Sequence, residues 1–191
     1  NSGEIAGSND GTITNSHSTG HISASRHTGG IAGENVGKIT NSYSTGNITA
    51  NTGSNSGGIA GQNYGTILNS YSTGDITVYN FYSGGITGDN EGTITNSYST
   101  GKITARMSDS GGIAGYNKEE GTITNCYSIG DIIAKNTGCA GGIAGNNEGT
   151  IINNCAYNNN VKSKKFANRV VGDNYGTLTN NYAKDGMVVQ G

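Results

Sequence analysis

The chain has no proline and no tryptophan among its 191 residues, and only three cysteines and 13 % charged residues. Without proline or a glycine at every third position, it cannot form a collagen helix. Intrinsic disorder is typically rich in charge, Pro, Glu and Lys, so the composition argues against it. No apolar run approaches the ~20 residues of a membrane helix, and we expect no membrane insertion. Three cysteines is an odd number, so no disulfide framework can be inferred from the sequence.

Charge of either sign is also scarce, and the formal net charge at pH 7 is -2. A weakly acidic chain of this kind gives no reason to expect nucleic acid or an anionic membrane as its main partner. No signal peptide stands at Asn1, so we interpret the chain as a mature protein or a cut-out fragment. The abundant residues are instead 34 Gly and 27 Asn.

The sequence repeats itself along its whole length. Gly-Gly-Ile-Ala-Gly and its variants recur at intervals of 26 to 30 residues, and their last glycines are Gly7, Gly33, Gly61, Gly88, Gly115, Gly145 and Gly172. A fixed period of this size is typical of a solenoid or another repeat array. We therefore predict a single repeat domain over residues 1–191, with units at approximately 2–27, 28–55, 56–82, 83–109, 110–139, 140–168 and 169–191.

Each unit reads as short strands joined by turns. Ile13 lies between Thr12 and Thr14, an alternation of β-branched residues that favours strand. Gly and Asn interrupt every unit too often for a helix. We predict an all-β fold, a right-handed parallel β-solenoid with seven turns of about 27 residues and three short strands in each. A β-propeller does not fit this period, because one propeller blade needs ~40–45 residues. The remaining alternative is a stack of three-stranded antiparallel units.

Stacking such units places equivalent residues in columns. We expect three inward columns of mainly isoleucine, which begin at Ile5, Ile13 and Ile22, and an inward column of Ser16, Ser42, Ser70, Ser97 and Cys126. Two columns are asparagine, and we expect ladders of side-chain amides there rather than binding sites. The first stands at a corner and contains Asn15, Asn41, Asn69, Asn96, Asn125, Asn153 or Asn154, and Asn180; the second contains Asn9, Asn35, Asn63, Asn90, Asn117, Asn147 and Asn174.

Two outward arrays are candidate contact surfaces. The first is a row of His17, Tyr43, Tyr71, Tyr98, Tyr127, Tyr157 and Tyr182, of which Tyr43, Tyr71, Tyr98 and Tyr127 are the candidate adhesion residues. The alternative interpretation is that the row is only an outward packing ladder. The second is a flat Thr-X-Thr face of Thr12, Thr14, Thr40, Thr66, Thr93, Thr95, Thr122, Thr124, Thr150, Thr177 and Thr179, interrupted by Lys38, Leu68 and Ile152. Threonine is also simply a good residue for an exposed strand.

No catalytic or metal-binding motif is present, so we expect no enzymatic activity and no cofactor. Asp89 and Glu91 are the closest carboxylate pair, but they flank Asn90 in a turn segment. Cys126 and Cys155 would stack in adjacent units if one residue were inserted near Asn153, which allows either a disulfide or two buried thiols.

The repeated Gly-Gly-Ile-Ala-Gly-X-Asn-X-Gly-Thr-Ile-X-Asn-Ser/Cys-Tyr-Ser-Thr-Gly resembles the GLUG motif, best between Gly112 and Gly130. Such repeats occur in large bacterial surface and secreted proteins, including adhesin-like proteins and the non-catalytic part of immunoglobulin A metallopeptidases. The resemblance implies an extracellular or cell-surface repeat domain that acts as an adhesin or stalk and contacts a glycan or a host surface protein.

Two other functions remain open at this point. The Thr-X-Thr face resembles the ice-binding faces of β-solenoid antifreeze proteins, so ice is the alternative partner. The chain could also be a passive spacer beside a protease or adhesin domain. Self-association, end to end or side by side, is compatible with each of these functions.

Overall fold

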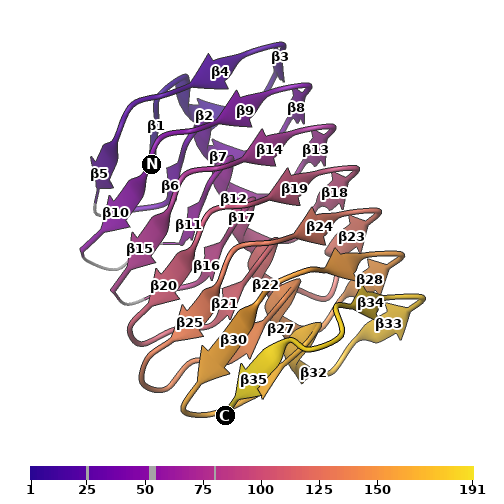
Figure 1. Cartoon of the computed structure of the whole chain (residues 1–191). Helices are drawn as coiled ribbons and strands as arrows, with labels where there is room; N and C mark the ends of the chain where they lie inside the picture. Colours follow the sequence, from indigo (N-terminus) through magenta and orange to yellow (C-terminus); the bar gives the residue numbers. More distant parts are fainter. Residues whose placement is uncertain (25, 52–54, 80) are drawn as a thin grey trace.

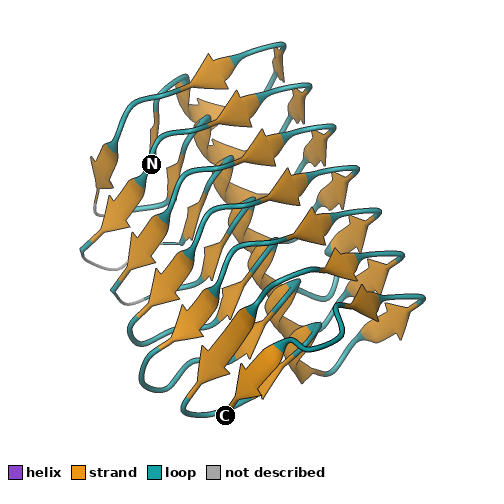
Figure 2. Cartoon of the chain, in the orientation of Figure 1, coloured by secondary structure: helices purple, strands orange, loops and turns teal. Residues whose placement is uncertain are grey.

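The fold is a stack of seven similar turns, each wound directly on the one before (Figure 1). We describe a computed structural model, which covers residues 1–24, 26–51, 55–79 and 81–191. The described part of the chain contains strands and connecting segments and no helix (Figure 2). Every turn contributes one strand to each of five parallel sheets, and each sheet has seven strands. The predicted all-β parallel solenoid is therefore confirmed.

Three of the five sheets consist of strands of three or four residues, and these are the three strands predicted for each turn. Numbered by the order in which a turn meets them, they are sheets II, III and V. Sheet II comprises β2 (Ala6–Asn9), β7 (Ala32–Asn35), β12 (Ala60–Asn63), β17 (Thr87–Asn90), β22 (Ala114–Asn117), β27 (Ala144–Asn147) and β32 (Val171–Asn174). Sheet III comprises β3 (Thr12–Thr14), β8 (Lys38–Thr40), β13 (Thr66–Leu68), β18 (Thr93–Thr95), β23 (Thr122–Thr124), β28 (Thr150–Ile152) and β33 (Thr177–Thr179). Sheet V comprises β5 (Ile22–Ala24), β10 (Ile48–Ala50), β15 (Ile76–Val78), β20 (Ile103–Ala105), β25 (Ile132–Ala134), β30 (Asn160–Ser163) and β35 (Val188–Gln190).

The other two sheets, I and IV, are built from two-residue strands that sequence reasoning did not find. Sheet I comprises β1 (Ser2–Gly3), β6 (Thr28–Gly29), β11 (Ser56–Gly57), β16 (Ser83–Gly84), β21 (Ser110–Gly111), β26 (Ala140–Gly141) and β31 (Ala167–Asn168). Sheet IV comprises β4 (His17–Ser18), β9 (Tyr43–Ser44), β14 (Tyr71–Ser72), β19 (Tyr98–Ser99), β24 (Tyr127–Ser128), β29 (Cys155–Ala156) and β34 (Tyr182–Ala183). A pair of residues is too short to show a periodic pattern, and only pairing with the neighbouring turns reveals these strands.

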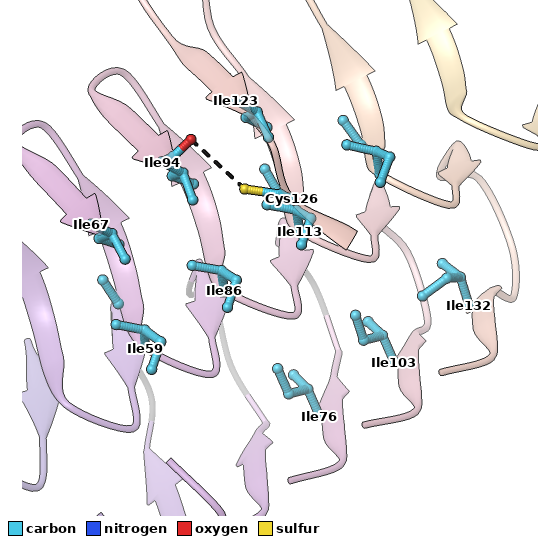
Figure 3. Close-up of a cluster of buried hydrophobic side chains, with 14 of the residues drawn as sticks. Ile59, Ile67, Ile76, Ile86, Ile94, Ile103, Ile113, Ile123, Cys126 and Ile132 are labelled. Atoms are coloured by element: carbon cyan, nitrogen blue, oxygen red, sulfur yellow. Dashed lines mark hydrogen bonds between the residues drawn. The ribbon is translucent and has the colours of Figure 1, made fainter. Parts of the chain in front are cut away.

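The core is formed by the predicted isoleucine columns, which point inward from successive turns (Figure 3). In the middle turns these side chains are completely buried, as Ile67, Ile94 and Ile123 are in sheet III. The equivalent Leu178 in the seventh turn is 42 % exposed, because no further turn lies over it. The inward serine column is confirmed as well, since Ser70 and Cys126 are both buried.

The corner between sheets III and IV depends on asparagine. Among the residues that the structure describes, seven non-glycine residues have a positive φ of 51° to 58°, and they are Asn15, Asn41, Asn69, Asn96, Asn125, Asn153 and Asn180. Asparagine enters this left-handed conformation more easily than other residues that carry a Cβ atom. The corner in the sixth turn is therefore Asn153 and not Asn154. Because this column is exposed to water, the expected amide ladder is limited: Asn69 donates to Asn41 at 3.2 Å and Asn96 to Asn69 at 3.3 Å.

The second asparagine column forms an unbroken ladder of amide hydrogen bonds inside the bend that connects sheets II and III. Each side-chain Nδ2 donates to the Oδ1 of the equivalent residue in the next turn, from Asn9 through to Asn174, at 2.7 to 2.8 Å. Asn90 also donates to the carbonyl of Gly92 at 3.0 Å, within its own turn. The ladder thus ties each turn to the next and at the same time satisfies the backbone of the corner.

The glycine pair of the repeat is required by close packing. A Cβ atom on Gly85 would lie 2.2 Å from the carbonyl oxygen of Gly112 and 2.2 Å from Oγ of Ser99. Both contacts are shorter than any Cβ atom tolerates, so a side chain at this position would force two turns apart. Glycine is therefore required at this position because successive solenoid turns contact each other there and because sheet IV approaches sheet I closely. The backbone geometry of a tight turn is not the whole reason.

Candidate functional site

The tyrosine row runs along sheet IV as one stack of parallel rings. His17, Tyr43, Tyr71, Tyr98 and Tyr127 follow each other in register on strands β4 to β24. Their ring centroids are 5.2, 4.9, 4.8 and 4.7 Å apart, with interplanar angles of 10°, 3°, 3° and 6°. The predicted outward row is therefore present for these residues, and Tyr182 lies in the same column in the seventh turn.

The prediction that Tyr157 belongs to this row is wrong. In the sixth turn Cys155 pairs with Tyr127 and takes the tyrosine position, while Tyr157 lies two residues further on. The reason is that no residue is inserted near Asn153: Asn153 takes the corner and Asn154 takes the inward position that Cys126 occupies in the fifth turn. The predicted stacking of Cys126 on Cys155 is wrong for the same reason.

Stacking determines which parts of the tyrosines are accessible. Each inner ring has a neighbouring ring on both faces, so only the ring edges and the phenol hydroxyls face solvent. A sugar ring cannot lie flat on Tyr71 or Tyr98, and a partner meets a line of hydroxyls instead. Partial burial, followed by the neighbouring tyrosines, raises the pKa of Tyr71 and of Tyr98 above the ordinary value. The hydroxyls of Tyr71 and Tyr98 therefore stay uncharged at neutral pH.

The Thr-X-Thr face covers the outside of sheet III as predicted. Strand pairing aligns Thr66, Thr93 and Thr122 in one column and Thr95 with Thr124 in the other. The remaining predicted members also lie on the paired strands of this sheet: Thr12, Thr14, Thr40, Thr150, Thr177 and Thr179. Columns of this kind repeat at ~4.8 Å between turns and ~6.7 Å along a strand. Lys38, Leu68 and Ile152 interrupt the array at the expected positions.

The carboxylates Asp89 and Glu91 are neutralised by a lysine that the sequence did not connect to them. Lys118, one turn later, makes an ion pair with Asp89 at 2.9 Å and a second ion pair with Glu91. Asp89 is only 3 % exposed and also accepts hydrogen bonds from Asn55 and Gln62. Burial lowers the pKa of Lys118, but hydrogen bonds to Glu91 and Asp89 outweigh it and raise that pKa overall. Lys118, Asp89 and Glu91 thus form an ion-pair network within the chain, on strands of sheet II and the segments that follow them.

The three cysteines are all free thiols. Burial raises the pKa of Cys126 and of Cys139 to about 12, which leaves both protonated at neutral pH. Cys126 lies in the core, where its sulfur contacts the carbonyl oxygen of Ile94 at 3.8 Å (Figure 3). A protonated, buried thiol is a poor nucleophile, so neither Cys126 nor Cys139 is a candidate for covalent chemistry.

Two kinds of feature are absent from the described residues. No group of three or more His, Cys, Asp or Glu side chains is placed to hold a metal ion there. In the same part of the chain, no helix has the length and apolar character needed to cross a membrane.

Comparison with known proteins identifies the repeat. The family model described as "The GLUG motif" matches four times, at residues 24–49, 52–77, 79–104 and 108–133, and these matches cover just over half of the chain. No curated protein and no solved structure matches the chain. Each match spans one full turn, from the end of one sheet V strand to the next, with the asparagine corner and the row position of sheet IV inside it. The chain therefore belongs to the GLUG-motif family of repeat proteins.

Proposed function

We propose that this chain is a non-enzymatic repeat segment of a bacterial surface or secreted protein, where it acts extracellularly as an adhesin or stalk. The observation that carries the proposal is the strand register, which is unbroken over all seven turns and stacks five consecutive rings from His17 to Tyr127. Such a rod holds equivalent positions at a constant spacing, which suits contact with an extended partner. Membership of the GLUG family supports this proposal.

The proposed contact surface is the hydroxyl line of the tyrosine row, with Tyr71 and Tyr98 at its centre. Because the rings cover each other, recognition would use hydrogen bonds to the phenol groups and contacts at the ring edges. The partner class that fits is a glycan or a host surface protein that presents polar groups along a line.

Two double variants test this surface separately from the fold. Changing Tyr71→Phe and Tyr98→Phe keeps the ring stack and removes only the hydroxyls, whereas Tyr71→Ala and Tyr98→Ala removes the rings as well. We expect the phenylalanine pair to retain the fold and to weaken binding on a glycan array or to cells by about tenfold, since each hydrogen bond contributes ~0.5–1.5 kcal/mol. The matched control is Tyr64→Phe with Tyr157→Phe, two exposed tyrosines outside the row. Full binding by both row variants would remove the tyrosine row as the adhesive surface.

Ice binding is the second candidate function, and the two threonine columns of sheet III favour it. Thermal hysteresis and ice-crystal shaping test it directly. The variant Thr95→Tyr with Thr124→Tyr places two bulky rings on that face and would abolish the activity. The control Thr77→Tyr with Thr104→Tyr makes the same change on the outer face of sheet V. Ice activity that survives the first pair would exclude the face.

If neither surface binds a partner, the remaining interpretation is a passive spacer. A rod of stacked turns would then hold a neighbouring protease or adhesin domain at a fixed distance. Equal binding by the unmodified chain and by all five double variants, at the level of a non-binding control protein, is the result that this interpretation predicts.

A further inference from the structure

A column of cations on the outside of sheet V is not explained by the fold. Strands β20, β25 and β30 pair in register, and the residues that follow their paired positions are Arg106, Lys135 and Lys164. All three are exposed and lie in successive turns, ~4.8 Å apart. Lys162 is two residues before Lys164 on β30 and therefore points to the same side of the sheet.

These charges repel each other and are not neutralised. Like charges on directly adjacent strands are destabilising. Among the described residues, the salt bridges are both formed by Lys118, which lies on a different face. Residues 149–172 contain no Asp or Glu that could supply a counter-charge in the sixth turn. Elsewhere in sheet V the chain avoids this arrangement, since Asp75, Lys102 and Asp131 alternate in sign on successive turns.

The cations line two hollows that share a residue. One has a volume of about 570 Å³ and is lined by Lys135, Lys162, Lys164 and Gln190 among others. The second, of about 500 Å³, is lined by Tyr79, Arg106 and Lys135 together with Thr77 and Thr104. Lys135 lines both hollows, so the two lie next to each other along the solenoid axis, with linings that reach from the second turn to the seventh. We call the two hollows together the basic groove.

One of the cations is already held in place. The guanidinium of Arg106 lies 4.8 Å from the centre of the Tyr79 ring, one turn earlier. This cation–π contact orients the side chain without consuming its hydrogen-bond donors. An arginine held in this way can bind a carboxylate or sulfate with two parallel hydrogen bonds.

We propose that this basic groove binds a linear acidic polysaccharide, one that carries a carboxylate or sulfate on successive sugar units. Such a chain is extended, and one sugar unit is comparable in length to one strand spacing, so its anions would meet Arg106, Lys135 and Lys164 in turn. The hydroxyls of Thr77 and Thr104 line the same groove and match sugar hydroxyls. The groove fits single-stranded nucleic acid less well, because bases need aromatic stacking platforms and Arg106 covers the face of Tyr79.

The basic groove lies on sheet V and is independent of the tyrosine row, which lies on sheet IV.

The test of polysaccharide binding uses the whole chain and measures binding of polygalacturonate and of heparin by calorimetry, with neutral dextran and a single-stranded oligonucleotide as further probes. We expect binding of at least one acidic polysaccharide, weaker at about 200 mM salt than at 50 mM, since the contacts are ionic. The variant Lys135→Gln with Lys164→Gln should lose about tenfold in affinity.

The matched control is Lys38→Gln with Lys102→Gln, which changes the net charge equally at exposed sites outside the groove. Retained affinity in this control, together with the loss in the groove variant, supports the proposal. Absent binding of both acidic polysaccharides, equal losses in the two variants, or tighter binding of the oligonucleotide would each overturn it. The adhesion test of Tyr71 and Tyr98 remains separate, because neither lysine pair alters the tyrosine row.

Discussion

The buried asparagine ladder predicts a strong dependence of stability on position within the rod. Asn90 is completely buried, accepts a hydrogen bond from Asn63 at 2.8 Å and donates to Asn117 at 2.7 Å. Asn90→Ala removes both bonds and leaves Oδ1 of Asn117 buried without a donor. The carbonyl of Gly92 keeps its backbone donor from Thr122 and adds little to the loss. One lost bond and one unsatisfied buried acceptor together predict a decrease of about 2–5 kcal/mol in the free energy of unfolding.

The matched control is Asn174→Ala at the end of the same ladder. Asn174 is exposed and accepts a single ladder bond, from Asn147 at 2.8 Å. Water can replace that bond, so the expected loss is at most about 1 kcal/mol. Urea unfolding at 25 °C, followed by circular dichroism and by tyrosine fluorescence, measures both variants, and coincident curves establish that the transition is cooperative. Equal losses for the two variants, or a loss below about 1 kcal/mol for Asn90→Ala, would refute the argument that the buried ladder ties the turns together.

Three further variants or titrations follow from the geometry. At the corner, Asn96→Gly should leave stability nearly unchanged while Asn96→Ala lowers it by about 1–2 kcal/mol, because φ is 51° there; equal urea midpoints would contradict this. Gly85→Ala should prevent folding, as judged by circular dichroism, whereas Gly11→Ala should be tolerated, since a Cβ on Gly11 meets nothing within 4 Å. Phenolate absorbance should show Tyr71 titrating above the ordinary pKa, and the stabilisation from this group should be complete below pH ~10 and lost as pH rises through the raised pKa. A normal titration curve in the folded chain would contradict the stacked arrangement.

Much of the architecture could be predicted because the same local sequence pattern occurs in all seven units. The alternation of β-branched residues around Ile13 predicted a strand, and the recurrence of asparagine at the position of Asn96 predicted a corner, which the structure shows with a positive φ. Each signal is weak in one unit, but its repetition gave the period and hence the columns. The tyrosine and threonine arrays followed from the same alignment, and the strand pairing agrees with both.

The predictions made from the sequence were wrong or incomplete at positions where the length of the repeat unit changes or where side chains of different turns make contact. Cys155 would stack on Cys126 only if one residue were inserted near Asn153, and only strand pairing shows that Cys155 aligns with Tyr127 instead. The ion pairs of Lys118 with Asp89 and Glu91 join different turns, so no local spacing indicates them. The same is true of the basic groove, whose cations are separated by a full turn of sequence.

The sequence alone predicted the parallel solenoid, because isoleucine, glycine and asparagine recur at intervals of about 27 residues, the length of one solenoid turn. The parallel strand pairing then excluded the antiparallel alternative. Only the tertiary structure decided how the stacked groups meet. It shows that the tyrosine rings cover each other and expose their hydroxyls, and that one asparagine ladder is buried while the other is hydrated. It also shows that Arg106, Lys135 and Lys164 are aligned in successive turns. The physical reason is that these properties depend on distances between turns, and those distances are fixed by backbone hydrogen bonds between residues about 27 positions apart.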